Sequence, residues 1–138
     1  MMRKIEKFMK RDVHQLPPTA SVYEAARLMA AQGCAAVVVS DGGRAQGIFT
    51  SGDFVKRVAA MKRSPVKTRL GDVMTRAPDT IEPTALAVDA LRMMQDGHYR
   101  HLPVVQGERI VGIVSRRDFF GDEQSIIEEG NRLSETMR

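Results

Sequence analysis

One short pattern occurs twice in this chain, 65 residues apart, and it constrains the fold more than any other feature of the sequence. Residues 47–53 read Gly-Ile-Phe-Thr-Ser-Gly-Asp, and residues 112–118 read Gly-Ile-Val-Ser-Arg-Arg-Asp. The same offset relates Met9 to Met74, so a single register holds over most of the chain. One copy alone would have too few strands and too small a core to be stable. The sequence therefore predicts two similar repeats that pack together.

Hydrophobic spacing predicts the same elements in both copies, in the order β-α-β-β-α, which is a mixed α/β (α+β) fold. Each copy should contain a short opening turn, a helix and two strands, at 5–9, 22–29, 35–40 and 45–50 in the first copy and at 70–74, 87–94, 102–105 and 110–115 in the second. Ser21 and Glu24 have the spacing of a capping box at the start of the first helix. Gly33 and Gly97 follow the two helices and should end them.

Two further helices are expected after the repeated motif. A helix that begins at Asp53 should bury one apolar face, made of Phe54, Val55, Val58 and Met61. In the second copy Gly121 interrupts this helix. A C-terminal helix from about residue 122 to 137 should bury Ile126, Ile127 and Leu133. We therefore expect a first repeat at 1–58, a linker at 59–68, a second repeat at 69–120 and a C-terminal helix or tail at 121–138, with the repeats related by a pseudo-two-fold axis.

The composition is typical of a globular protein in a reducing compartment. Hydrophobic residues make up 43% of the 138 residues, and the single cysteine, Cys34, excludes an internal disulfide. The N-terminus lacks the apolar segment of a signal peptide, and no apolar run is long enough to cross a bilayer. These features predict a cytoplasmic protein.

Catalytic and metal-binding patterns are weak in this sequence. His98 and His101 have an H-x-x-H spacing, but they enter a predicted strand, where they would point to opposite faces. Cys34 has no basic neighbour that would activate its thiol. No nucleophile–base arrangement, paired acid–base carboxylates or phosphate-loop glycines occur. We therefore expect no enzymatic activity, no enzyme cofactor and no metal site.

The repeated motif places a hydroxyl and a carboxylate at the junction between a strand and a helix, in Thr50 with Asp53 and in Ser115 with Asp118. Free N–H groups and the positive end of the helix dipole at such a junction favour an anion such as phosphate. A carboxylate can also accept both hydrogens of a ribose diol. The same residues could instead form a capping box with no ligand. The duplication in one register favours nucleotide binding over capping alone.

At this point the motifs resemble the CBS domain, the module named after cystathionine β-synthase. Residues 47–53 and 112–118 look like its G-h-x-[T/S]-x-x-D signature, and 73–75 (Val-Met-Thr) and 101–105 (His-Leu-Pro-Val-Val) look like two further landmarks. The resemblance covers roughly residues 4–120. It implies a tandem pair that folds as one α/β unit and forms a disc-like homodimer. It also implies clefts between the repeats for adenosine-containing ligands: AMP, ADP, ATP, S-adenosylmethionine or NAD-type dinucleotides.

The resemblance also implies which residues would line the two clefts. Ribose would bind Asp53 in one cleft and Asp118 in the other, with Thr50 and Ser115 on the phosphate side. The expected site at Asp53 comprises Thr50, Ser51, Gly52, Asp53, Ala77, Pro78, Asp79, Tyr99, Arg100 and His101. The expected site at Asp118 comprises Ser115, Arg116, Arg117, Asp118, Asp12, Val13, His14, Cys34, Ala35 and Ala36.

The two copies differ at positions that would affect a ligand. The charged pair that the family often has before the aspartate is present as Arg116 and Arg117, whereas the first copy has Ser51 and Gly52. The apolar run 34–38 also lies in the part of the first copy that corresponds to Arg-His-Leu-Pro-Val at 100–104 in the second. We therefore expect two unequal sites.

The functional hypothesis is a regulatory sensor that reports energy or redox state to an unknown protein in trans. A dimeric interaction scaffold with vestigial clefts is one alternative. A polyanion binder is another, because six basic residues and no acidic one lie within 54–71; they are Lys56, Arg57, Lys62, Arg63, Lys67 and Arg69. The absence of aromatic residues among them counts against nucleic acid.

Overall fold

The computed structural model describes residues 2–136, which form two compact units. The Asp53 unit comprises Val13–Pro78 and Glu108–Ile110. The Asp118 unit comprises Met1–Asp12, Asp79–Gly107 and Val111–Arg138. Both units combine strands and helices, so the fold is mixed α/β, as the sequence predicts.

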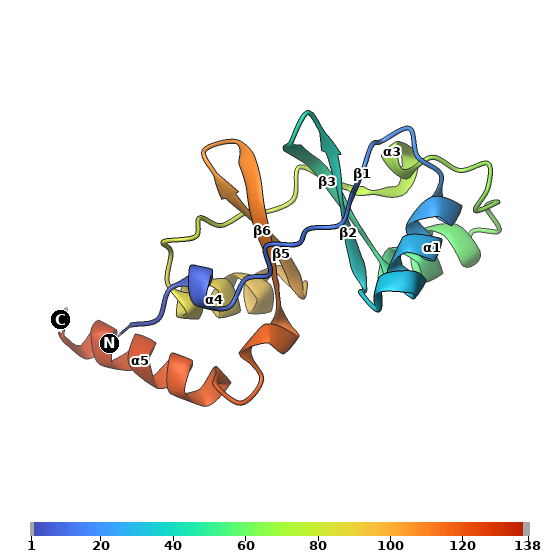
Figure 1. The fold of residues 1–138 in the computed structure, drawn as a ribbon. Coiled ribbons are helices and arrows are strands. Elements are labelled where there is room, and N and C mark those ends of the chain that lie inside the picture. Colours follow the sequence, from blue (N-terminus) through green and yellow to red (C-terminus); the bar gives the residue numbers. More distant parts are fainter. Residues whose placement is uncertain (1, 137–138) are drawn as a thin grey trace. The chain divides into compact units, whose positions relative to one another are not determined.

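A four-stranded sheet forms the centre of the Asp53 unit, in the order β1-β2-β3-β4 (Figure 1). Its strands are β1 (Gln15–Leu16), β2 (Ala36–Asp41), β3 (Arg44–Thr50) and β4 (Thr75–Arg76). β1 runs parallel to β2, and the other neighbours are antiparallel. The β2–β3 turn contains two glycines with positive φ, Gly42 and Gly43, which suits the predicted hairpin. The hairpin brings Thr50, at the end of β3, beside Ala36 at the start of β2.

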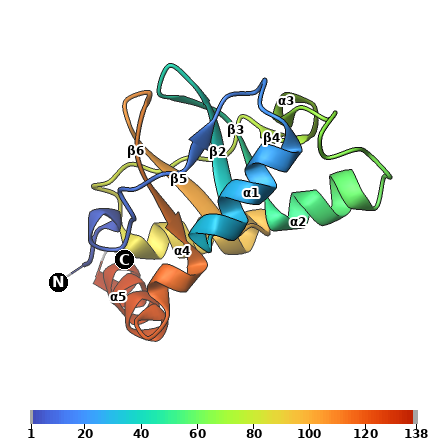
Figure 2. The same cartoon turned by 45° about the vertical axis from the view of Figure 1, so that its right-hand side comes forward.

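The helices of the Asp53 unit lie on one side of this hairpin (Figure 2). α1 (Val22–Gln32) begins at Ser21, whose Oγ accepts the N–H of Glu24 at 3.1 Å, and ends at Gly33 with φ +65°. α3 spans Leu70–Val73. α2 (Ser51–Asp53) begins directly after β3 and continues as a π-helix over Phe54–Ala59.

The segment after Asp53 is a π-helix, and the apolar face predicted to be buried there is only partly buried. The hydrogen bonds of the π-helix run from residue i to i+5, as in the bond from Ala60 N–H to Val55 O at 2.9 Å. This wider turn rotates side chains away from the positions that a 3.6-residue period predicts. Val58 is buried as predicted, whereas Val55 and Met61 are 61% and 64% exposed.

The Asp118 unit repeats the same strand pairing with fewer residues. Its hairpin consists of β5 (His101–Gln106) and β6 (Arg109–Ser115). Two single-residue bridges flank it: Ile81 pairs with Val104 in parallel, and Lys10 pairs with Ile113 in antiparallel orientation. Each pair lies 65 residues from a pair in the other sheet, Leu16 with Val39 and Thr75 with Ile48. The duplicated sequence therefore folds with a duplicated register.

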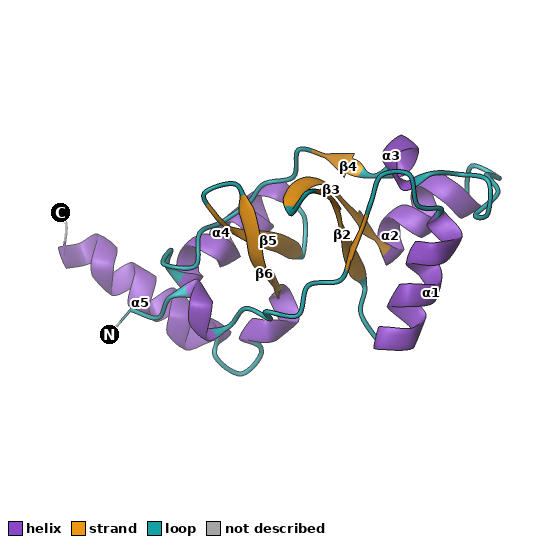
Figure 3. Ribbon diagram, turned by 45° about the horizontal axis from the view of Figure 1, so that its top comes forward, coloured by secondary structure: helices purple, strands orange, loops and turns teal. Residues whose placement is uncertain are grey.

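Helices α4 (Ala87–Gly97) and α5 (Glu123–Thr136) complete the Asp118 unit (Figure 3). α4 ends at Gly97, as predicted, but the left-handed cap position is taken by the next residue, His98, with φ +57°. His98 is 65 residues after Gly33, so this end also follows the repeat. A Cβ at Gly97, the last residue of α4, would collide with the Tyr99 ring.

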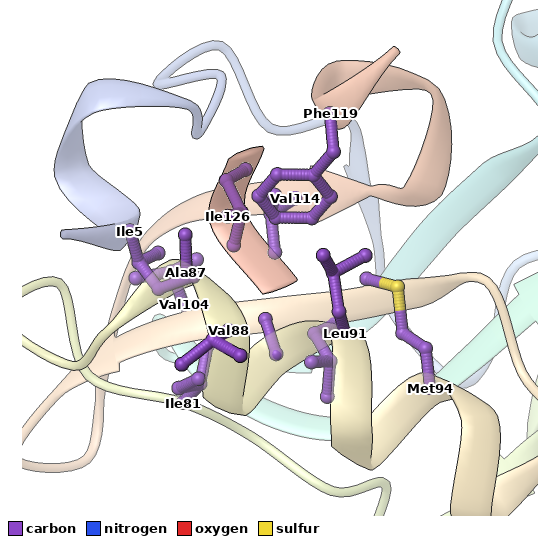
Figure 4. Close-up of a cluster of buried hydrophobic side chains, with 12 residues drawn as sticks. Ile5, Ile81, Ala87, Val88, Leu91, Met94, Val104, Val114, Phe119 and Ile126 are labelled. Carbon is purple, nitrogen blue, oxygen red and sulfur yellow. The ribbon is translucent and has the colours of Figure 1, made fainter. Parts of the chain in front are cut away.

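The core of the Asp118 unit lies between its hairpin, α4 and α5 (Figure 4). Phe119, Val114 and Leu91 meet there with Ile126 of α5. The prediction that Ile127 and Leu133 are also buried is wrong, since they are 44% and 38% exposed. α5 turns Ile126 and, one turn later, Gly130 towards α4, so Ile127 faces outwards.

The opening turns of the two repeats are exchanged between the units. Ile5, from the turn at Ile5–Lys7, is fully buried in the core of the Asp118 unit. Leu70 and Val73, from the equivalent turn before the second repeat, are buried in the core of the Asp53 unit. Each compact unit is therefore assembled from segments that are distant in the sequence.

Candidate functional site

Asp53 and Thr50 form a closed hydrogen-bonded pair at the start of α2. One carboxylate oxygen, Oδ2, accepts both the Thr50 N–H at 2.9 Å and the Thr50 Oγ1–H at 3.1 Å. In return the Asp53 N–H donates to Thr50 Oγ1 at 3.2 Å. This is a capping box, and it holds the carboxylate in a fixed orientation.

Asp118 and Ser115 repeat this geometry after β6. Asp118 Oδ2 accepts the Ser115 N–H at 2.7 Å and the Ser115 Oγ–H at 3.2 Å. The following turn, Arg116–Phe119, is a short 3-10 helix rather than an α-helix. Capping and ligand binding do not exclude each other here, because in both units the cap uses Oδ2 and leaves Oδ1 for another partner.

A cation lies beside Oδ1 in each unit, but it comes from a different place. Arg57 Nε is 3.6 Å from Asp53 Oδ1, one helical turn along the same segment. Lys10 Nζ is 3.7 Å from Asp118 Oδ1 and comes from the N-terminal segment. The two carboxylate side chains are only 16% and 11% exposed. Each is therefore a largely buried anion with one neighbouring cation.

The two cations differ in how firmly they are held. Arg57 Nη1 also donates to the carbonyl oxygens of Val73 and Met74, both at 3.1 Å. The Lys10 side chain is 70% exposed, and the Nζ contact to Asp118 is its only ion pair among residues 2–136. Sequence reasoning missed both cations. The i, i+4 spacing of Asp53 and Arg57 could have revealed one, whereas Lys10 reaches Asp118 only through the exchange of the opening turns.

His101 and Arg100 lie in the same unit as Asp118. Burial lowers the pKa of His101 below its usual 6.5; the Asp118 carboxylate opposes this shift and Arg100 adds to it. The lowered pKa favours the neutral form of the imidazole. The Arg100 carbonyl accepts the Arg116 N–H at 2.9 Å, which joins the start of β5 to the turn of Asp118.

Tyr99 and Asp79, which were assigned to the Asp53 site, contact each other within the Asp118 unit. The Tyr99 hydroxyl donates to Asp79 Oδ2 at 2.8 Å. Burial and this carboxylate raise the pKa of the Tyr99 phenol, so it stays protonated at physiological pH. The pair fixes the segment that enters β5.

The other predicted residues are also placed within single units. In the Asp53 unit the Ala35 carbonyl accepts the Ser51 N–H at 3.0 Å, Cys34 is half-buried, and Ala77 has a left-handed φ of +44°. Gly52 is exposed, as is Asp12 in the other unit. The remaining members, Val13, His14, Ala36 and Pro78, also belong to the Asp53 unit. That each aspartate site is completed by the other repeat stays a prediction.

The two arginines that precede Asp118 differ in their availability. Arg116 Nη2 donates to Glu123 Oε1 at 2.5 Å, so its charge is already compensated. Arg117 is exposed. Within residues 2–136, no group of three or more His, Cys, Asp or Glu side chains could hold a metal ion. No helix in that range is long and apolar enough to cross a membrane.

Comparison with known proteins finds one family. The model of the CBS domain family matches residues 5–60 and again 70–122. YlbB of Bacillus subtilis is 34% identical over 136 residues, which cover 97% of this chain and 91% of that protein. The CBS domain-containing protein CBSCBSPB1 of Arabidopsis thaliana is 33% identical over 100 residues, or 72% of this chain, but the match spans only 18% of the longer plant protein.

Solved structures share the fold over most of the chain. The CBS-domain containing protein ATU1752 of Agrobacterium tumefaciens is 31% identical with a TM-score of 0.77, over 84% of this chain and 95% of that one. The CBS domain protein PAE2072 of Pyrobaculum aerophilum, solved in complex with AMP, is 23% identical with a TM-score of 0.83, over 92% and 97% of the two chains.

Proposed function

Because this chain belongs to the CBS domain family and is a regulatory CBS pair, we propose that it binds adenosine-containing nucleotides through Asp53 and Asp118. The observation that carries the proposal is the repeated orientation of the two carboxylates. In each, the capping box occupies Oδ2, and Oδ1 contacts a cation. A fixed carboxylate with one available oxygen is suited to accept hydrogen bonds from the vicinal hydroxyls of ribose.

The phosphate side of the ligand would lie at the start of the following turn. Thr50 and Ser115 stand there with extended backbones, immediately before helical residues. Backbone N–H groups and hydroxyls at such a position favour an anion. AMP, ADP, ATP, S-adenosylmethionine and NAD-type dinucleotides share the ribose and remain the candidate ligands. AMP is favoured as the first to test, since a CBS protein of the same fold was solved with it.

The regulatory output would be a change in how a homodimer presents itself to a partner protein. A ligand shifts a conformational equilibrium only by its difference in affinity for the two states. A hexameric CBS-CP12 protein of cyanobacteria, which shares this fold, is an example of a CBS assembly. We infer that this chain, too, acts as an oligomer and not as an enzyme.

Thermal unfolding with and without ligand tests the proposal. The protein, stripped of carried-over nucleotide, is heated with AMP, ATP, NAD or S-adenosylmethionine. A ligand at about 100 times its Kd should stabilise the folded state by about 2.7 kcal/mol. Asp53→Asn and Asp118→Asn keep the side-chain shape but remove the charge, and each should reduce the shift. Thr19→Ser, at an exposed position away from both motifs, is the control.

Two outcomes would contradict the proposal. If no nucleotide changes the unfolding temperature, the clefts are vestigial and the scaffold alternative is favoured. If a nucleotide stabilises the protein equally in both Asp→Asn variants and in their combination, it binds elsewhere.

A further inference from the structure

Lys10, which pairs with Asp118, has a backbone held by hydrogen bonds and a side chain that is exposed. The Lys10 N–H donates to the Ile113 carbonyl at 2.8 Å, and the Ile113 N–H donates back to the Lys10 carbonyl at 2.9 Å. The side chain beyond this bridge is 70% exposed and contacts Asp118 Oδ1 at 3.7 Å. The position of Lys10 is therefore set by the sheet, while its ammonium can move by rotation about side-chain bonds.

Ribose binding would compete with this ion pair. Asp118 Oδ2 already accepts two hydrogen bonds from Ser115, so the ribose hydroxyls must use Oδ1. The ammonium of Lys10 would then lose part of its contact with the carboxylate. An unphosphorylated ribose offers it no replacement, whereas a phosphate is an anion to which it can move.

The equivalent cation in the Asp53 unit is not released in this way. Arg57 stays anchored by the carbonyl oxygens of Val73 and Met74, whether or not Asp53 Oδ1 is occupied. The position that corresponds to Lys10 is Thr75, which pairs with Ile48 as Lys10 pairs with Ile113. The Asp53 unit thus lacks a mobile ammonium at this point of the sheet.

We propose that Lys10 makes the Asp118 site selective for phosphorylated over unphosphorylated adenosine ligands, because its ammonium exchanges the Asp118 carboxylate for a ligand phosphate. The proposal rests on the nucleotide binding proposed above and adds a charge preference to one of the two sites. Of the two arginines that precede Asp118, Arg116 is already paired with Glu123, whereas Arg117 is exposed and remains a second basic residue that a phosphate could contact.

Calorimetric titration of the full chain with adenosine, AMP and ADP tests this assignment. The Asp53→Asn background isolates the Asp118 site. Lys10→Met removes the ammonium and keeps the length of the side chain. AMP binding should weaken about tenfold, the effect of losing one charge-assisted contact. Adenosine binding should stay equal or tighten, because no ion pair has to be broken. Lys7→Met removes the same charge from an exposed residue of the same segment and should change neither ligand.

A second set of variants tests whether the preference for AMP over adenosine can be introduced at the Asp53 site. Thr75→Lys in the Asp118→Asn background should raise the preference of the Asp53 site for AMP over adenosine, and Lys10→Arg should retain the preference of the Asp118 site. Equal weakening of adenosine and AMP by Lys10→Met would show a structural role and overturn the selectivity, while nucleotide binding itself would stand. If neither ligand binds the unsubstituted protein, the proposed function and this inference both fail.

Discussion

The Asp53 and Asp118 units have the same backbone motif but compensate their carboxylates differently. Both caps direct Oδ2 to a hydroxyl and an N–H of the residue three positions earlier. In the Asp53 unit the cation comes from the same helical segment, whereas in the Asp118 unit it comes from the exchanged N-terminal segment. A duplicated motif can therefore preserve its geometry while the cation that balances its carboxylate comes from a different part of the chain.

The largest expected loss of stability is at two glycines, one in each unit, where a neighbouring backbone segment passes too close to leave room for a side chain. A Cβ at Gly112 would lie 2.9 Å from the Lys10 carbonyl oxygen, and one at Gly47 would lie 2.8 Å from that of Thr75. Gly112→Ala and Gly47→Ala should therefore each destabilise the protein by about 2 kcal/mol. Urea unfolding measures this loss. Gly52→Ala is the control, since its Cβ would meet only the Thr50 hydroxyl at 3.6 Å. Comparable stability of all three variants would refute the shared close approach.

The next effect separates the anchored cation from the mobile one. Arg57→Gln removes a guanidinium that donates to two backbone carbonyls, so it should cost about 1–2 kcal/mol of unfolding free energy. Lys10→Gln removes an ammonium that is 70% exposed and 3.7 Å from the carboxylate, so it should cost less than about 0.5 kcal/mol. Denaturant unfolding of the two variants gives the difference. A larger loss for Lys10→Gln would reverse our assignment of the two roles.

A smaller effect concerns the ends of the two equivalent helices. His98 adopts φ +57° at the end of α4, where Gly33 stands at the end of α1. Glycine adopts this conformation without steric cost, so His98→Gly should stabilise the protein by about 0.5–1 kcal/mol. Gly33→Ala should destabilise it by a similar amount. Thermal melts of both variants check the pair, and a loss of stability in His98→Gly would point to an unrecognised role of the imidazole.

The smallest expected effect is a pH dependence that only the Asp118 unit should show. The pKa of His101 is lowered by burial, and its counterpart in the repeat is Ala36. Between the usual His pKa of about 6.5 and the lowered value, the unfolded chain binds more protons than the folded one. This contribution to stability is present above pH 6.5 and is lost as the pH falls. His101→Gln should reduce the acid sensitivity of unfolding. An unaltered profile in His101→Gln would contradict the burial of the imidazole.

The elements with strong local signals could be predicted from the sequence. The strand predicted at 45–50 is β3, Arg44–Thr50, and the one predicted at 110–115 is β6, Arg109–Ser115. Turn glycines and short apolar runs determine such hairpins locally. The N-cap at Ser21 was also predicted, and its Oγ accepts the Glu24 N–H. Capping boxes at Asp53 and Asp118 were the alternative to a ligand-binding motif, and both are present.

The features that the sequence did not predict depend on the type of helix and on contacts between residues distant in the sequence. The π-helix after Asp53 exposes Val55, because its hydrogen-bond pattern departs from the helical period on which the prediction relied. At Gly97 a Cβ would collide with the Tyr99 ring, a tertiary contact that the sequence pattern does not reveal. The contact of Lys10 with Asp118 depends on which unit receives the opening turn, and tertiary packing decides this.

A ribose diol should bind Oδ1 of each capped aspartate, the carboxylate oxygen that the capping box does not use. Calorimetric titration with AMP and with 2′,3′-dideoxy-AMP, which differs only in lacking the two hydroxyls, tests it most directly. We predict that AMP binds the unsubstituted protein at least about tenfold more tightly than the dideoxy analogue, the effect of about 1.4 kcal/mol from the lost hydrogen bonds. We also predict that Asp53→Asn combined with Asp118→Asn removes most of this difference. Equal binding of the two ligands would contradict the account.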